Sequence, residues 1–284
     1  MSRALTVLAT GPQALVQDLG RPGNAHLGVP PSGALDPPAL KLANRLVGNP
    51  ESFAGIEVLL GGLRLRAEAS CTVAVTGPPV VVTVGGRCAD THRPVHLGAG
   101  DELALTAPDR GLRNYVAVSG GITVPAELGS RATDVLSGIG PAPLTEGTVL
   151  PVGDRVGLPE AADAIAPTHV RPALRIPVVL GPRDDWFDDA AAQLSAGRWT
   201  VSASSNRVGL RLEGTALDRA EGELASEGML TGAIQVPAGG LPVIFLADHP
   251  TTGGYPVIGV VPADALPVLA QARPGTELHF GPVE

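Results

Sequence analysis

The sequence predicts a mainly β protein with two domains, and three observations support this prediction. The chain has 284 residues, which exceeds the roughly 100–200 residues of a typical domain. Its 37 glycines and 28 prolines interrupt many short runs of β-branched and other apolar residues, a pattern typical of antiparallel barrels and sandwiches. A hydrophobic content of 44% excludes a disordered chain rich in proline and glycine.

Strands are expected where a short apolar run lies between turn residues. In chain order, these runs occupy residues 5–9, 71–77, 80–86, 101–107, 115–121, 149–153, 175–181, 241–247, 255–261 and 277–282. Turn signals separate them, so most neighbours along the chain are expected to pair antiparallel.

A few helices are expected between these strands. The first has the clearest signals, because Asp36 suits the N-cap, Pro37 suits the first helical position, and Gly48 can end the helix. Acidic residues in the first turn of the second helix would interact favourably with the positive end of its dipole. The predicted helices cover residues 36–48, 184–197 and 262–275.

The domain boundary is expected at residues 158–172. This stretch has no strand pattern and contains several small residues and prolines, as linkers do. The prediction is therefore a β-rich N-terminal domain at 1–157 and a C-terminal β-barrel domain at 173–284.

Composition excludes several classes of function. The net charge is −8 and aromatic residues make up 3% of the chain, so the sequence lacks both the basic surface and the stacking rings of nucleic-acid binders. Lys41 is the only lysine, which excludes Schiff-base chemistry and a lysine-containing phosphate loop. Any phosphate would be held by arginine or by backbone N–H groups.

The cysteines and the N-terminus bear on metal binding and localisation. Cys71 and Cys88 lie in predicted strands without metal-site or redox spacing, so we expect buried free thiols and no metal site. The N-terminal segment is too polar for a secretion signal, and no apolar run approaches the roughly 18 residues that span a bilayer. A cytoplasmic protein is therefore expected.

The first candidate site lies near the N-terminus. Gln17, Asp18 and Arg21 lie on a glycine-rich turn, and Ser32 precedes the first helix. These residues place a carboxylate, an amide, a guanidinium and a hydroxyl close together in sequence. A turn held by an Asp–Arg pair is the purely structural alternative.

The second candidate site is the segment that contains Asn206, Arg207 and Arg211. On a strand both arginines would share one face, with Gly209 leaving room between them. Like charges side by side are unfavourable unless an anion lies between them, so this segment predicts an anion site. A solvated strand face is the alternative.

The remaining candidates are Glu227, Gln235 and the loop that begins at Asp248. Gly253 and Gly254 would let backbone N–H groups approach an anion and form a nest. The same loop carries further polar groups on His249, Thr251, Thr252 and Tyr255.

The sequence resembles the biotin-dependent carboxyltransferase family in which subdomains A and B are fused, most closely the branch that supplies the C subunit of 5-oxoprolinase. The resemblance lies in VQDLGRPGNAHLGVPPSGALDPPALKLANRLVGNPE, YVAVSGGI, LGSRAT, GPRDDWF, SNRVGLRLEG, SEGMLTGAIQVPAGGLPVIFLADHPTTGGYPVIGVV and LAQARPGTELHF. These segments occur in family order along nearly the whole chain. The resemblance implies two cyclophilin-like β-barrel domains.

The resemblance also implies a reaction, which is the ATP-dependent opening of 5-oxo-L-proline to L-glutamate. Phosphorylation of the ring oxygen would create a leaving group, and arginines and glycine amides would neutralise its charge. With this reaction in view, the residues assigned to catalysis are Asp18, Arg21, Arg207, Arg211 and Asp248. Those assigned to substrate or phosphate binding are Gln17, Ser32, Asn206, Glu227, Gln235, His249, Thr251, Thr252, Gly253, Gly254 and Tyr255.

The implied cofactor is ATP with Mg²⁺, shared with the A and B subunits as partners, and no covalent biotin is expected on this chain. Two other functions stay open. One is the carboxyltransferase part of a urea or amide carboxylase. The other is a regulatory protein that antagonises a kinase inhibitor resembling the B subunit.

Overall fold

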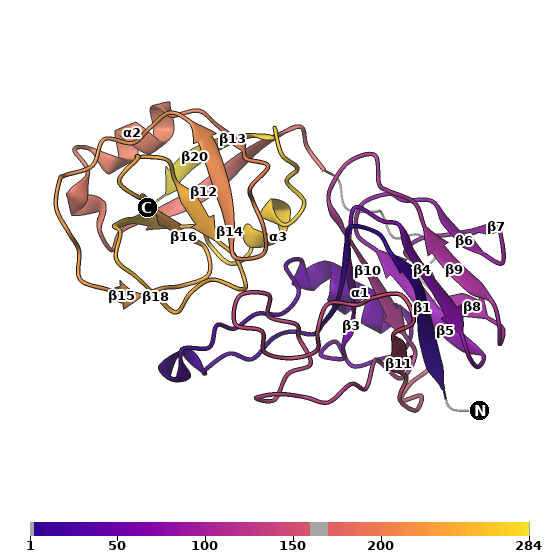
Figure 1. The fold of residues 1–284 in the computed structure, drawn as a ribbon. Helices are drawn as coiled ribbons and strands as arrows, with labels where there is room; N and C mark the ends of the chain where they lie inside the picture. Colours follow the sequence, from indigo (N-terminus) through magenta and orange to yellow (C-terminus); the bar gives the residue numbers. More distant parts are fainter. Residues whose placement is uncertain (1–2, 160–169, 284) are drawn as a thin grey trace. The chain divides into compact units, whose positions relative to one another are not determined.

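A computed structural model describes residues 3–159 and 170–283, which form two compact units (Figure 1). The first unit comprises Met1–Arg21, Asp36–Asp134 and Gly138–Val170. The second comprises Pro22–Leu35, Val135–Ser137 and Arg171–Glu284. Most of the expected linker at 158–172 lies outside the described residues. Two short segments of the N-terminal half, 22–35 and 135–137, thus belong to the second unit. The prediction places both in the N-terminal domain at 1–157.

The first unit is built from two antiparallel sheets that share one core. The order of the first sheet is β11 (Val149–Pro151), β1 (Ala4–Thr10), β4 (Leu63–Ala67), β9 (Glu102–Leu105), β6 (Val82–Val84) and β7 (Arg87–Ala89). The order of the second is β2 (Gln13–Gln17), β3 (Gly55–Leu59), β10 (Arg113–Val118), β5 (Cys71–Thr76) and β8 (Val95–Leu97). Alternate residues of both sheets, such as Val7, Leu65, Val16 and Val73, bury their side chains in the common core.

Helix α1 (Pro37–Leu46) packs on the second sheet of this unit and begins where the sequence predicts. The Asp36 side chain accepts a hydrogen bond from the Ala39 N–H at 3.1 Å, which satisfies one N-terminal donor of the helix. Ala43 and Leu46 lie on its buried face and contact Ala74 and Ala117.

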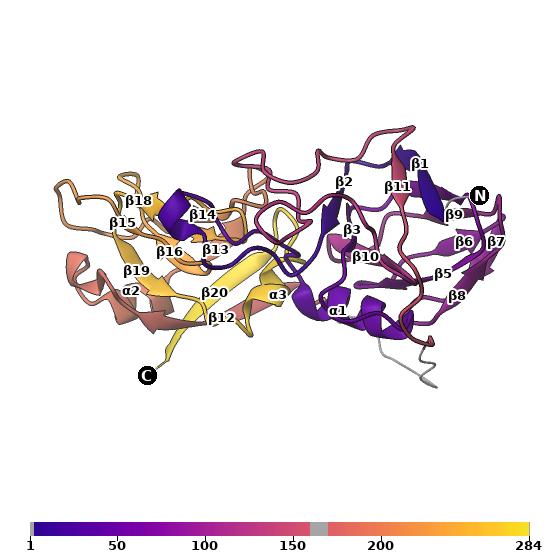
Figure 2. The same ribbon diagram turned by 90° about the horizontal axis from the view of Figure 1, so that it is seen from below.

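The second unit is a closed β-barrel (Figures 1 and 2). Its strand order is β12 (Ala173–Leu180), β19 (Val257–Val260), β16 (Ala233–Gln235), β17 (Val243–Phe245), β14 (Gly209–Gly214), β13 (Trp199–Val201) and β20 (Glu277–Val283). The first and last strands in this order, β12 and β20, pair parallel and close the barrel. Ile176, Leu212, Ile234, Ile244 and Leu278 are among the side chains that fill it.

Short helices and a ribbon complete the second unit. The helices are η1 (Ala25–Leu27), η2 (Asp184–Trp186), α2 (Ala190–Ala196) and α3 (Leu266–Leu269), and the ribbon pairs β15 (Glu227–Gly228) with β18 (Thr252–Gly253). Figure 2 shows the indigo segment with η1 lying beside the orange strands of its own unit. Met229, Ala233, Phe245 and Val257 form a second, smaller apolar cluster, separate from the barrel core.

The prediction of a mainly β fold with few helices is confirmed. Among the described residues, the strands of the second unit form a closed barrel, and those of the first unit form two sheets around one core. In the first unit, β11, β7, β2 and β8 remain sheet edges.

Three local predictions also differ from the structure. The helix expected at 184–197 is interrupted, because Asp189 has a left-handed φ of 47° and caps α2 by accepting from the Ala192 N–H. The third helix is shorter than expected. Both cysteines are free, but Cys88 is exposed because β7 lies at a sheet edge. No described helix is long and apolar enough to cross a membrane.

Candidate functional site

Asp248 and Arg207 form a buried ion pair in the second unit. The Arg207 Nε donates to Asp248 Oδ2 at 2.9 Å, and Nη2 donates to Asp248 Oδ1 at 3.1 Å. Nη2 also donates to the Gly33 carbonyl at 2.6 Å. Asp248 is 0% exposed and Arg207 is 2% exposed, so the pair is shielded from water. Its two hydrogen bonds fix the orientation of both side chains.

Two further donors reach the same carboxylate from distant parts of the chain. The Ser32 hydroxyl donates to Asp248 Oδ1 at 2.7 Å, and the Val135 N–H donates to Oδ2 at 3.1 Å. Ser32 has a left-handed φ of 52°, and its N–H donates to the Ala247 carbonyl at 3.0 Å. We call Ser32, Val135, Arg207 and Asp248 the clamp, because together they hold segments 22–35 and 135–137 against the barrel of their unit.

The clamp changes the interpretation of the two arginines. Strand β14 begins at Gly209, after Arg207, because the Asn206 side-chain oxygen accepts from the Val208 and Gly209 N–H groups and forms a turn there. Arg207 is therefore buried, whereas Arg211 is exposed on the strand. The expected shared face does not form, and the anion that neutralises Arg207 is the carboxylate of Asp248.

The ribbon presents a second ion pair, which is open to solvent. Arg183 donates through Nε to Glu227 Oε2 at 3.0 Å and through Nη2 to Oε1. The side chains of Arg183 and Glu227 are 35% and 28% exposed. The hydrogen bond from Arg183, followed by its charge, lowers the pKa of Glu227, while partial burial opposes this shift. Glu227 is therefore an ionised acceptor at neutral pH.

Gln235 lies beneath the ribbon and anchors it. Its Nε2 donates to the Tyr255 carbonyl at 3.2 Å, and the side chain is 7% exposed. A Cβ atom on Gly253 would lie 2.5 Å from this Nε2, so the missing side chain makes room for the amide. Neither Gly253 nor Gly254 has a left-handed φ, and Gly253 pairs with Glu227 in the ribbon. The expected anion-binding nest therefore lacks its alternating backbone conformation.

The other residues of this loop differ in accessibility. His249 is 3% exposed, its Nδ1 lies 2.7 Å from the Pro250 carbonyl, and its ring is 6.1 Å from that of Phe245. Thr252 is exposed and Tyr255 is 45% exposed, whereas Thr251 is half-buried. The groups that a small molecule can reach are thus Thr252, Tyr255 and the Arg183–Glu227 pair.

The N-terminal candidates hold a loop of the first unit. Asp18 accepts from the Gly20 N–H at 2.8 Å, the Ser130 hydroxyl at 2.6 Å and the Arg131 N–H at 2.6 Å. Arg21 is 2% exposed and donates to the Ala132 carbonyl. Gln17 is 0% exposed and its Nε2 donates to the Thr133 carbonyl at 2.8 Å. These three residues are brought together at residues 130–133, whereas Ser32 bonds to Asp248 in the second unit.

Sequence reasoning missed two groups. One is Arg183, whose signal is its place in the GPRDDWF segment. The other is a buried network in the first unit, where the Tyr115 hydroxyl donates to Glu57 Oε2 at 2.8 Å and accepts from the Asp36 N–H at 2.8 Å. Arg113 Nε lies 3.4 Å from Glu57 Oε1. Burial, followed by the charges of Glu57 and Asp36, raises the pKa of Tyr115 well above its usual value.

The described residues do not fit the expected phosphate site. Arg207 binds Asp248, whereas Arg211 is exposed on β14. The glycine nest is not formed. Within residues 3–159 and 170–283, no group of three or more His, Cys, Asp or Glu side chains could hold a metal ion. What the geometry offers is a rigid loop with exposed hydroxyls beside an ionised carboxylate and a guanidinium.

The comparisons with known proteins agree with this architecture. Residues 27–282 match the family described as carboxyltransferase domain, subdomain A and B. The C subunit of the 5-oxoprolinase of Escherichia coli (strain K12) is 37% identical over 97% of this chain and 90% of its own length. The urea amidolyase of Lachancea kluyveri is 32% identical over 99% of this chain, which spans 17% of that protein.

A solved structure extends the likeness to three dimensions. The crystal structure of the K. lactis urea amidolyase superposes with a TM-score of 0.92 at 30% identity, covering 100% of this chain and 19% of that one. The two sequence matches cover 97% and 99% of the chain, and the structural match covers all of it. The chain belongs to the carboxyltransferase family defined by subdomains A and B.

Proposed function

We propose that this chain is the C subunit of an ATP-dependent 5-oxoprolinase, which acts with the A and B subunits to open 5-oxo-L-proline to L-glutamate. The observation that carries the proposal is the 37% identity to the corresponding E. coli protein over 90% of that protein's length. The urea amidolyases match at lower identity, and only over a small part of their length. Because the described residues do not form a phosphate site, ATP and Mg²⁺ are proposed to be bound by the partner subunits.

The chemistry of a lactam fits the accessible groups of the ribbon. A lactam presents an N–H donor and a carbonyl acceptor on the same edge of its ring, because its amide is held cis. Glu227 is an ionised acceptor that suits the N–H, and the Tyr255 or Thr252 hydroxyl suits the carbonyl oxygen. The clamp and Gln235 hold both ends of the loop, so these groups are preorganised.

Reconstitution tests the proposal. The chain is purified with the A and B subunits, and formation of L-glutamate and ADP is measured with 5-oxo-L-proline and ATP. Turnover is expected only when all three proteins are present. A correctly assembled complex that forms no L-glutamate would exclude the proposed activity.

Two variants test the proposed contacts in the same assay. Glu227→Gln and Tyr255→Phe are expected to lower kcat/KM by about ten- to a hundredfold, since each removes one hydrogen bond to the reacting amide. Arg175→Gln is the control on the exposed face of β12 and should keep full turnover. Full turnover in both Glu227→Gln and Tyr255→Phe would exclude the surface formed by the ribbon and Tyr255 as the contact with substrate.

A second candidate is the carboxyltransferase part of a urea or amide carboxylase. The TM-score of 0.92 to the K. lactis urea amidolyase favours it. No described feature requires biotin on this chain, so the biotinylated domain would be a separate partner. Biotin-dependent carboxylation of urea by the reconstituted mixture, without L-glutamate formation from 5-oxo-L-proline, would favour this candidate over the first.

A further inference from the structure

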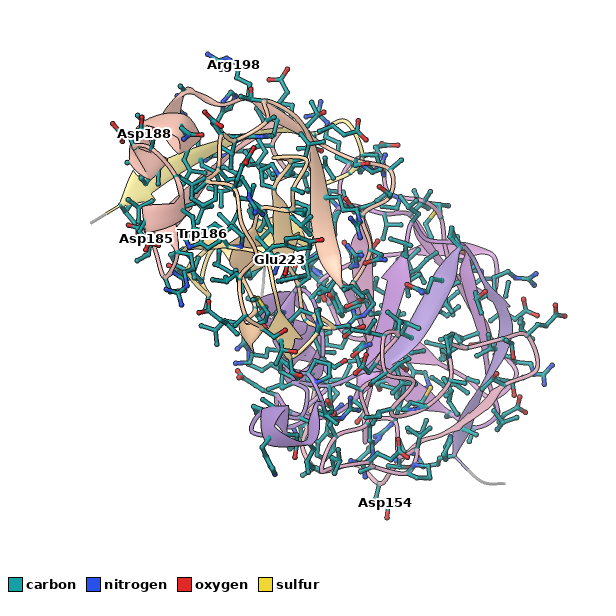
Figure 3. All side chains as sticks on the ribbon, turned by 60° about the vertical axis from the view of Figure 1, so that its left-hand side comes forward. Asp154, Asp185, Trp186, Asp188, Arg198 and Glu223 are labelled. Carbon is teal, nitrogen blue, oxygen red and sulfur yellow. The ribbon has the colours of Figure 1, made fainter. Side chains whose placement is uncertain are left out.

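A separate pocket lies on the outer surface of the barrel of the second unit, where β14, β13 and β20 run side by side. Its volume is about 360 Å³, and its lining includes Arg198, Thr200, Glu213, Glu277 and His279. Figure 3 shows the Arg198 side chain projecting from the surface of this unit. The ribbon is anchored by Gln235 at the end of β16, which pairs with β17 and β19. Neither β16 nor β19 neighbours β13 or β20 in the strand order.

One end of the pocket is acidic. In the strand register, Thr200 lies opposite Glu213 on one side and opposite Glu277 on the other. Directly opposed side chains of paired strands point to the same face of the sheet. Two carboxylates therefore flank one hydroxyl. In the described part of the chain, neither Glu213 nor Glu277 forms an ion pair with a basic side chain.

The other end of the pocket is basic. Arg198 Nη1 lies 3.3 Å from His279 Nδ1. Arg198 precedes Thr200 by two residues next to β13, and His279 follows Glu277 by two residues on β20. Side chains two residues apart on a strand share a face and stand about 6.6 Å apart. The basic and acidic ends are thus separated by one strand repeat.

We propose that this pocket binds a small zwitterion whose ammonium and carboxylate groups lie on the order of 6 Å apart, matching that repeat. The ammonium group lies between Glu213 and Glu277, where three N–H donors meet two carboxylates and the Thr200 hydroxyl. The carboxylate lies at Arg198, which supplies charge-assisted N–H donors, with His279 beside it. The chemical class is that of γ-amino acids and of α-amino acids with an acidic side chain.

Separation of the two charges determines selectivity. A simple amine would engage only the acidic end and a simple carboxylate only the basic end. Glycine carries both charges but too close together to span one strand repeat. Since the side chains are solvated, the affinity is modest, with a Kd on the order of 1 mM for the best zwitterion.

Calorimetric titration of the full chain with γ-aminobutyrate tests the proposal, with tryptophan fluorescence as a second readout because Trp199 lines the pocket. γ-Aminobutyrate is expected to bind at least about fivefold more tightly than glycine, propylamine or butyrate. Glu277→Gln and Arg198→Gln are each expected to weaken it about three- to fivefold. The matched controls are Glu223→Gln, which lies elsewhere on this unit, and Arg87→Gln on the first unit.

Three results would overturn the inference. They are absence of binding at concentrations well above the expected Kd, equal binding of propylamine and γ-aminobutyrate, and unchanged affinity in both Glu277→Gln and Arg198→Gln. The measurement uses the isolated full chain and no other protein. Its outcome is therefore independent of whether the chain acts in a 5-oxoprolinase.

Discussion

The carboxylate of Asp248 and the guanidinium of Arg207 bind each other through two hydrogen bonds in the interior of the second unit. Both residues were assigned to catalysis from the sequence, and in the structure each neutralises the charge of the other. Removing either partner of a buried, bidentate pair is strongly destabilising, because the remaining charge stays in a medium that does not solvate it. Its first role is therefore to hold the loop that begins at Asp248, and segments 22–35 and 135–137, in place.

Removal of one partner is expected to destabilise the second unit severely. Arg207→Leu leaves the Asp248 carboxylate buried without its countercharge, which costs about 3–5 kcal/mol. Trp186 and Trp199 are the only tryptophans and both lie in the second unit, so urea unfolding followed by tryptophan fluorescence reports on this unit. Arg211→Leu is the control, and a change within about 0.5 kcal/mol is expected there. Equal stability of the two variants would show that the clamp is not a major source of stability.

Gly253, in the ribbon, and Gly254, which follows it, should respond differently to a methyl group. In Gly253→Ala the new Cβ would lie 2.5 Å from Gln235 Nε2 and 3.0 Å from Met229 Cε. The amide must move and lose its bond to the Tyr255 carbonyl, at a cost of about 1–2 kcal/mol. In Gly254→Ala the nearest atom is 3.4 Å away, and little change is expected. The same fluorescence assay distinguishes them, and an equal response of both variants would contradict the proposed anchoring by Gln235.

Tyr115 should stay protonated in alkaline solution while the protein is folded. Burial raises its pKa well above the usual value of about 10. The folded state therefore gains stability from the protonated phenol below pH 10 and loses it as the pH rises further, since the unfolded chain ionises first. In the Tyr255→Phe variant Tyr115 is the only tyrosine, so phenolate absorbance should appear only with unfolding. Phenolate absorbance near pH 10 in the folded variant would contradict this.

Arg183 should control the ionisation of Glu227. The hydrogen bond from Arg183 lowers the pKa of Glu227, so the pair stabilises the fold above the ordinary pKa of about 4.3, and that contribution is lost as the pH falls through the lowered value. In Arg183→Gln the pKa of Glu227 is expected to return upward, as measured by NMR titration of the carboxyl carbon. Arg175→Gln, an exposed arginine on β12, is the control and should leave the Glu227 titration unchanged.

Much of the fold follows from local sequence signals. Asp36 and Pro37 predict the start of α1 because capping involves only nearby residues. The apolar runs at 71–77 and 115–121 become β5 and β10, whose side chains are buried on both faces. The short strands β15 and β18 were not predicted, since two paired residues leave no periodic pattern.

The candidate site was harder to predict because its contacts join distant parts of the chain. Ser32, Val135 and Asp248 are separated by more than a hundred residues at each step, and no local pattern indicates that they meet. Arg207 was placed on a strand by alternation, but the Asn206 side chain forms a turn and delays the strand by two residues. Arg207 therefore lies outside the strand, where alternation does not set its direction, and it is buried while Arg211 is exposed.

The second unit is assembled from three separate stretches of chain, 22–35, 135–137 and 171–284. Cutting the gene between the two predicted domains would therefore not release a complete C-terminal module. The hydroxyl of Ser32, the carbonyl of Gly33 and the N–H of Val135 would remain on the other piece. During synthesis segments 22–35 and 135–137 leave the ribosome before the barrel strands to which they bind. Recombination between relatives would therefore have to exchange these three stretches together.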